Sequence, residues 1–344
     1  MDLLLPPTAA TGTAAREQVA VVGAGSIGTA WIVVFAGAGL RVRVYEANDA
    51  VRATTMGTVR AKLAELATAG LLDDDPAAIL ARVCVCDTLE DALTGVHYVQ
   101  ESVIEDLDVK VELFREMDRL TGRDVVLASS TSTIVASSFA ADLPGRDRCL
   151  VVHPGNPPYF LRVAEIVPAD FTSAEAIAAA RDLLVEVDIA PVVLDHEVEG
   201  FVFNRLQGAL LREAYCLVRD GVISVADLDV LVRDGLGRRW SVIGPFTTSE
   251  LNTRGGLRRH GEVLGPVYAR LGLERGQENP WTAETIERVA TEVQAQLPHR
   301  EWEDNVRERD RAMTNLAVLL RTFDNPLARR REAVRERAVV ADET

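Results

Sequence analysis

Three glycines mark the part of the sequence with the clearest chemistry. They stand in a GxGxxG order, Gly23-Ala24-Gly25-Ser26-Ile27-Gly28, after a Val-rich run and before a stretch of helical periodicity. The first glycine permits a tight turn, the second lets the backbone approach a pyrophosphate, and the third allows close helix–strand packing. Amide groups at the start of the helix would donate to the phosphates. The pattern predicts a dinucleotide site, although a glycine turn in an α/β sheet without a ligand has the same spacing.

An acidic residue stands where the ribose of such a cofactor would lie. Glu46 ends the alternating run Arg41–Glu46 and is followed by Ala47-Asn48-Asp49. A carboxylate accepts hydrogen bonds from the ribose 2′- and 3′-hydroxyls, and it would face a 2′-phosphate unfavourably. Because no arginine follows immediately, the sequence favours NAD over NADP. The alternative is an exposed glutamate at a strand end.

A histidine and a glutamate offer proton transfer. His153 ends the apolar run Cys149–Val152 and opens the loop Pro154–Pro158, and Glu165 lies within the apolar run Val163–Val167. A buried carboxylate needs a partner, and a protonated histidine would serve. A histidine oriented by a glutamate can take a proton from an alcohol as hydride leaves. The sequence leaves open whether the two meet or His153 is only structural.

An α/β sheet is needed to position these residues. Gln18–Val22, a helix from Ser26 and Arg41–Glu46 make a β-α-β unit, whose right-handed crossover makes the strands parallel. Strand-like runs recur to about residue 194 and fade after Gly200. We expect an α/β fold: an N-terminal Rossmann domain with a doubly wound, mostly parallel sheet, followed by an all-helical C-terminal domain.

Length and local composition divide the chain into four segments. Its 344 residues suit two domains of roughly 150 residues each. We expect a disordered leader at 1–17, the NAD-binding Rossmann domain at 18–198, the helical domain at 199–325 and a charged tail at 326–344.

The charge balance excludes several kinds of partner. Lys and Arg number 37 against 52 Asp and Glu, a formal net charge of −15. Phosphate backbones and anionic lipid surfaces would repel such a chain, so we expect neither a nucleic acid nor a membrane as partner. A small anionic ligand is not excluded, because a local cluster of donors overrides the global sign.

Cysteine usage and the N-terminal residues bear on the compartment. Cys84, Cys86, Cys149 and Cys216 are too few and too scattered for a disulfide framework. The CxC pair is expected to be two buried thiols on one face of a strand rather than part of a metal site, since no second Cys/His pair stands nearby. The start of the chain has no basic segment typical of a signal peptide. We expect a reduced, cytoplasmic protein.

Further motifs follow one another in a specific order and spacing. Besides the glycines they are Gln100–Glu105, Lys110, Glu112–Phe114, Ser129–Ser132, His153–Tyr159, Glu165, Gly200–Leu206 and Gly235–Trp240. Over about residues 18–325 the chain thereby resembles the 3-hydroxyacyl-CoA dehydrogenase superfamily, and within it the lambda-crystallin/L-gulonate 3-dehydrogenase branch.

The resemblance implies four catalytic roles. His153 would be the general base in oxidation, and Glu165 would orient it and stabilise its charge. Ser132 would hydrogen-bond the hydroxyl or carbonyl oxygen of the substrate. Asn204 would bind the substrate and the nicotinamide side.

The resemblance also places Glu105 and Lys110 along the cofactor site. Structural alternatives stand beside two of the catalytic roles. Ser132 could instead be a helix N-cap, and Asn204 could satisfy a buried backbone group.

The expected substrate is a small anionic 3-hydroxy acid. The segment Gly244–Asn252 looks like the gulonate branch, and a related group acts on carnitine, another free 3-hydroxy acid. A carboxylate two carbons from the reacting hydroxyl calls for a cation, for which Arg239 is the candidate because a guanidinium binds carboxylates bidentately. Arg238 is the second choice, and either could be a surface charge.

Together these features predict an NAD-dependent enzyme that oxidises the 3-hydroxyl of a free, L-gulonate-like 3-hydroxy acid to the 3-keto acid. The alternatives are a 3-hydroxyacyl-CoA or carnitine 3-dehydrogenase and, from another class, a non-catalytic crystallin-like protein. The family resemblance and the apolar residues of 201–211 predict a homodimer formed through the helical domain. No metal site is expected.

Overall fold

The structure is a computed structural model that describes residues 18–254, 256–275 and 298–322, and the single positions 282, 284, 287 and 291. The expected leader at 1–17 and the charged tail at 326–344 lie outside these residues. Contacts divide the chain into two compact units: the first ends at Arg205 and takes in Met313–Val318, and the second begins at Leu206. In the part of the chain described, no helix is long and apolar enough to cross a membrane.

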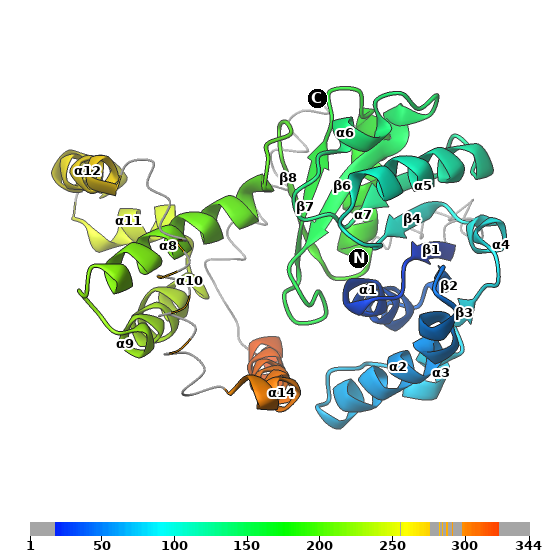
Figure 1. Cartoon of the computed structure of the whole chain (residues 1–344), viewed down its shortest axis with the longest axis horizontal. Coiled ribbons are helices and arrows are strands. Elements are labelled where there is room, and N and C mark those ends of the chain that lie inside the picture. The colour runs from blue at the N-terminus through cyan, green and yellow to red at the C-terminus, as the bar shows by residue number, and fades with distance from the viewer. Residues whose placement is uncertain are drawn as a thin grey trace, which may run out of the picture. The chain divides into compact units, whose positions relative to one another are not determined.

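The first unit is built on an eight-stranded sheet in the order β3-β2-β1-β4-β5-β6-β7-β8 (Figure 1). All neighbouring strands pair in parallel except β6 and β7. In chain order the elements are β1 (Gln18–Val22), α1 (Ser26–Gly37), β2 (Arg41–Tyr45), α2 (Asp49–Thr68), α3 (Pro76–Leu80), β3 (Val83–Val85), α4 (Leu89–Leu93), β4 (Tyr98–Glu101), α5 (Leu107–Leu120), β5 (Val126–Ser129), α6 (Ala136–Ala140), the 3₁₀ turn η2 (Arg146–Arg148), β6 (Cys149–Pro154), β7 (Val163–Pro168), α7 (Ala174–Glu186) and β8 (Ala190–Val193).

Hydrophobic side chains cover both faces of this sheet. Successive residues of a strand point to opposite faces, so Val19 and Val21 of β1 pack with α1, α2 and α7, while Ala20 and Val22 pack with α4, α5 and α6. Helices on both faces explain why central strands such as β1 and β6 consist mainly of buried apolar residues. The predicted doubly wound, mostly parallel sheet with a helical C-terminal part is confirmed.

The strand order places a crevice at the centre of the sheet. The chain leaves β1 for β2 on one side, whereas β4 lies against β1 on the other side. Connections that diverge in this way leave room at the carboxyl ends of the two strands, where α/β proteins bind ligands. The glycine loop after β1 and the segment after β4 both open at this point.

The helices that follow begin with α8, which starts within the first unit and continues into the second. They are α8 (Phe201–Arg219), α9 (Val225–Val230), the π-helix η3 (Leu231–Gly237), α10 (Arg238–Trp240), α11 (Pro245–Asn252), α12 (Gly256–Arg275), the 3₁₀ turn η4 (His299–Glu301) and α14 (Trp302–Thr322). Inside the second unit, Arg275 of α12 bridges to Glu213 and Asp220 at 3.1 and 2.7 Å.

The structure corrects the expectation for the CxC pair. Cys84 is exposed and only Cys86 is buried. The strand β3 is three residues long and ends at Val85, so Cys86 lies beyond it and the two thiols do not share a buried strand face. In the described residues, no group of three or more potential metal ligands is present.

Candidate active site

The glycine loop has the close contacts that only glycine permits. Gly23 has φ +98°, and a Cβ there would lie 2.6 Å from the carbonyl oxygen of Ser102. A Cβ at Gly28 would lie 1.9 Å from the carbonyl oxygen of Gly23, which explains the tight packing of α1 on its own loop. At Gly25, the N-cap of α1, a Cβ would meet no atom within 4 Å, and no side chain caps the first amides of the helix. Such a terminus suits a phosphate group.

Glu46 is held against this loop. Its carboxylate accepts from the backbone N–H of Ala24 at 2.7 Å and from that of Asn48 at 2.9 Å. Glu46 and the glycine loop line one cleft of about 950 Å³. Arg52 also lies beside Glu46, but its guanidinium donates to the Glu46 carbonyl oxygen and to Asp49. The local cation is therefore already engaged.

His153 and Glu165 face each other across the antiparallel pair β6–β7. Their Cα atoms are register partners, and His153 Nδ1 lies 2.9 Å from Glu165 Oε2. The two side chains are 8% and 7% exposed. The β7 strand runs against its neighbour, and this reversal brings two residues twelve apart in the chain into contact. The hydrogen bond at Nδ1 leaves Nε2 as the ring nitrogen available to a substrate.

The second oxygen of Glu165 is bound by the start of α8. Backbone N–H groups of Val202 and Phe203 donate to Oε1 at 2.8 and 2.9 Å. The chain reaches this position through two consecutive left-handed residues, Gly200 at φ +74° and Phe201 at φ +51°. A positive φ is costly for a bulky residue and is kept where surrounding contacts require it. The helix terminus thus stabilises the negative charge of Glu165.

Aromatic side chains from the same helix start enclose the histidine. The ring of Phe201 is fully buried and lies 5.4 Å from the His153 ring, and that of Phe203 lies 6.1 Å away in a T-shaped arrangement. Together with the bond to Glu165, these contacts leave the imidazole little freedom to rotate.

Ser132 and Asn204 are also brought together. Asn204 Nδ2 donates to the Ser132 carbonyl oxygen at 2.8 Å. Asn204 therefore binds a backbone group, but that group belongs to an exposed residue, the other predicted substrate residue, and not to a buried one. Ser132 is exposed, and it is not the N-cap of α6, a position held by Val135.

Glu105 contacts the Ser132 loop. One carboxylate oxygen, Oε1, accepts from the hydroxyls of Thr131 and Thr133 and from the backbone N–H groups of Ser132 and Thr133, at 2.6–3.0 Å. Burial alone would raise the pKa of Glu105, but these hydrogen bonds and the charge of Lys110 outweigh it and hold that pKa below its ordinary value.

Lys110 lies beneath this loop. Its side chain is 1% exposed, and its ammonium donates to both oxygens of Glu101 at 2.9 Å. Ser129 donates to the same carboxylate at 2.5 Å. Lys110 is therefore enclosed behind Glu105, and its place along the cofactor site stays a prediction.

A buried polar cluster, which was not predicted, connects α1 and the end of β4 with the strand that carries His153. Gln100 Nε2 donates to Ser130 Oγ at 2.7 Å and to the Val152 carbonyl oxygen at 3.3 Å, next to His153. Trp31 Nε1 and Ser102 Oγ also contact Ser130 Oγ, at 3.2 and 2.9 Å. The only sequence signal was polarity at Gln100 and Glu101 inside an otherwise apolar strand.

Arg239 belongs to the second unit and is described within it. It lies in α10, directly after the π-helix Leu231–Gly237, and its side chain is exposed. A π-helix is rare and occurs often at functional sites. Arg238 pairs with Asp234 at 3.7 Å, whereas no ion pair of Arg239 is seen among the described residues.

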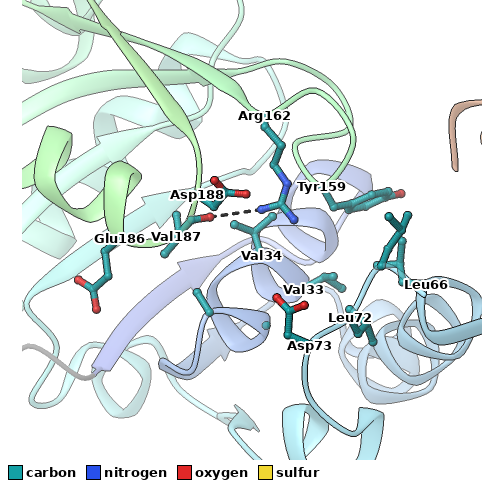
Figure 2. Close-up of a pocket in the computed structure, with 13 residues that line it drawn as sticks. Val33, Val34, Leu66, Leu72, Asp73, Tyr159, Arg162, Glu186, Val187 and Asp188 are labelled. Carbon is teal, nitrogen blue, oxygen red and sulfur yellow. Dashed lines mark hydrogen bonds between the residues drawn. The ribbon is translucent and has the colours of Figure 1, made fainter. Parts of the chain in front are cut away.

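A second pocket, of about 210 Å³, lies beside the later half of α1 (Figure 2). Arg162 points into it and donates to the Val187 carbonyl oxygen at 3.3 Å. Three acidic residues, Asp73, Glu186 and Asp188, are also among those that line it. None of the predicted site residues is among those that line it, so it is separate from the candidate active site.

The chain matches two family descriptions in succession. Residues 18–198 match "3-hydroxyacyl-CoA dehydrogenase, NAD binding domain", and residues 200–294 match "3-hydroxyacyl-CoA dehydrogenase, C-terminal domain". The chain belongs to the 3-hydroxyacyl-CoA dehydrogenase family. As a member of this family it is an NAD-dependent oxidoreductase of the hydroxy acid and hydroxyacyl class, and NAD(H) is supported as its cofactor.

Relatives of this chain include a lambda-crystallin homolog and an L-carnitine dehydrogenase. It is 37% identical to the lambda-crystallin homolog of Bos taurus over 77% of this chain and 84% of that one. It is 33% identical to L-carnitine dehydrogenase of Streptomyces coelicolor over 87% and 93%. Among solved structures, the NAD⁺-dependent dismutase 5-formyl-3-hydroxy-2-methylpyridine 4-carboxylic acid 5-dehydrogenase superposes with a TM-score of 0.76 and 25% identity, over 90% of this chain and all of that one.

Two glycine substitutions should affect different properties, one the affinity for NAD and the other the thermal stability. Gly25→Ala adds a methyl group in open space, so the unfolding temperature should change by no more than about 2 °C while NAD affinity falls about tenfold or more. Gly28→Ala places its methyl against the Gly23 carbonyl oxygen and should lower the unfolding temperature itself. Thermal unfolding and NAD titration measure both. Undiminished NAD affinity in Gly25→Ala would mean that pyrophosphate binds elsewhere.

Proposed function

We propose that this protein uses NAD to oxidise the 3-hydroxyl of a small free 3-hydroxy acid, L-gulonate-like, to the 3-keto acid. The observation that carries the proposal is the connected set of contacts from Glu165 to His153 and from the start of α8 through Asn204 to Ser132. It joins a proton acceptor to an exposed hydroxyl in a chain whose family performs this kind of reaction.

In this proposal, His153 Nε2 takes the hydroxyl proton as the carbonyl forms. Its Nδ1–H donates to Glu165, whose negative charge stabilises the imidazolium that results. Ser132 donates a hydrogen bond to the reacting oxygen, and Asn204 orients the substrate. Bound NAD supplies a hydride acceptor, so the substrate loses one hydride and one proton. The glycine loop and the open amides of α1 are the residues that would hold its pyrophosphate.

The proton-transfer role of His153 is tested by His153→Gln. General acid–base groups contribute about 10²–10⁴-fold, so kcat should fall by that order while NAD affinity is preserved. His196→Gln, which changes an exposed histidine between β8 and α8, is the matched control and should leave turnover unchanged. Steady-state NADH production and NAD titration give the two numbers. Near-normal turnover in His153→Gln would disprove the assignment.

A preference for NAD over NADP is proposed from the position of Glu46. Glu46→Gln keeps the size of the side chain but removes the charge that a 2′-phosphate would meet, so the ratio of kcat/KM for NAD over NADP should narrow by about tenfold. Glu90→Gln, another carboxylate of the same cleft, should leave the ratio near its original value. A wild-type enzyme that already prefers NADP would contradict the proposal.

A free carboxylate on the substrate is proposed to bind Arg239. Loss of one desolvated charge pair costs on the order of 2–5 kcal/mol, so Arg239→Met should raise KM for the acid at least about tenfold. The methyl ester of the same acid carries no charge and should be affected far less. Arg238→Met is the matched control, since that guanidinium already pairs with Asp234. Equal losses for acid and ester would make Arg239 a structural residue.

Related substrates and a non-catalytic role are separated by one screen. Relatives are named lambda-crystallin homolog, L-carnitine dehydrogenase and 3-hydroxyacyl-CoA dehydrogenase. NADH production from sugar acids, 3-hydroxybutyrate, carnitine and acyl-CoA thioesters distinguishes a free-acid, a carnitine and a thioester dehydrogenase. No turnover with any of these substrates would favour a crystallin-like role.

We also propose a homodimer that forms through the helical residues, which expose Leu206, Phe246 and Leu273.

A further inference from the structure

We infer that Glu105 is a positioning residue for Ser132, holding the peptide that presents the Ser132 hydroxyl to the substrate. The inference rests on the proposed function, because it assigns a purpose to the contacts around a substrate residue of that reaction. It differs from the role that family resemblance implies for Glu105, which is to line the cofactor site.

The contacts of Glu105 converge on a single oxygen. Its Oε1 accepts from the Thr131 hydroxyl at 2.6 Å, from the Ser132 N–H at 2.9 Å, and from the N–H and hydroxyl of Thr133, each at 3.0 Å. A carboxylate oxygen has two lone pairs, so four donors saturate it and leave none for a ribose hydroxyl. The other oxygen, Oε2, faces the Lys110 ammonium at 3.7 Å.

A second layer of polar contacts fixes the loop from below. In the buried pair Glu101–Lys110, Glu101 Oε2 accepts a hydrogen bond from the Ser129 hydroxyl. Ser129 Oγ in turn accepts from the N–H of Thr131 at 3.2 Å. Burying two charges is expensive, and replacing such a pair with apolar residues often costs no stability. Here the pair holds Lys110 beneath Glu105, so that a cation stands behind the carboxylate that binds the loop.

Fixing the Ser132 peptide also fixes Asn204, so two proposed substrate-binding residues are held at once. The Ser132 N–H is held by Glu105, and its carbonyl oxygen accepts from Asn204. A displacement of about 1 Å at a reacting group costs on the order of 10²-fold in rate. Weakening the Glu105 contacts therefore lowers the rate of the chemical step without removing any atom that touches the substrate.

A double-mutant cycle with Glu105→Gln and Ser132→Ala tests the inference. In the wild-type background Glu105→Gln should lower kcat by about 10- to 100-fold, with KM for NAD changed by less than about threefold. In the Ser132→Ala background the same change should lower kcat by less than about threefold, because the group it positions is already gone. Equal falls in both backgrounds, or a rise in KM for NAD with kcat unchanged, would overturn it.

Single-hydroxyl variants keep the test informative if Glu105→Gln unfolds. Thr131→Val removes one donor and should lower kcat, whereas Thr131→Ser keeps that donor and should restore it; failure of Thr131→Ser to restore kcat would count against positioning. Glu175→Gln, which changes an exposed carboxylate in the first turn of α7, is the control for loss of charge and should leave kcat unchanged.

Amide hydrogen exchange examines the loop without turnover. In Glu105→Gln the N–H groups of Ser132 and Thr133 should exchange at least about tenfold faster, whereas those of β1 should not change. Unchanged exchange at both positions would overturn the inference even in a protein with no dehydrogenase activity. Conversely, if the wild-type protein has no dehydrogenase activity but Glu105→Gln shows the faster exchange, only the proposed function is refuted.

Discussion

The Glu165 carboxylate is the contact on which the candidate site depends. One oxygen binds His153 Nδ1 and the other binds two backbone amides at the start of α8. The charge is thus compensated from two directions although the side chain is almost fully buried. The reversed strand β7 and the left-handed turn at Gly200 and Phe201 both serve to complete these bonds. Each of these features is otherwise an irregularity in a parallel sheet and a regular helix.

Local sequence patterns predicted the first half of the fold well, because each pattern there has a local cause. The glycine spacing, the Val-rich strand before it and the helical period after it all concern neighbouring residues. The loop closes as expected because Gly23 and Gly28 touch each other and the segment at Ser102. In contrast, α7 was not predicted, although Ser173 caps it and alanines fill it.

Site residues that depend on distant contacts were harder to predict. The sequence left open whether His153 meets Glu165, because only the antiparallel pairing of β6 with β7 decides it. Only the family resemblance placed Lys110 along the cofactor site, and no contact of its side chain could be predicted from neighbouring residues. Its ammonium turns inward to Glu101, a residue whose burial no local pattern revealed. The exposure of Cys84 likewise depends on where β3 ends, and a three-residue strand gives alternation too little length to be read.

The turn into α8 has a consequence for how this protein can evolve. The NAD-binding match ends at residue 198 and the C-terminal match begins at 200, yet the amides that bind Glu165 and the amide of Asn204 all come after that junction. Recombination at the junction would therefore replace the residues that bind Glu165 and Ser132 along with the helices. The segment around Gly200 has to satisfy these hydrogen bonds as well as connect the two matched regions.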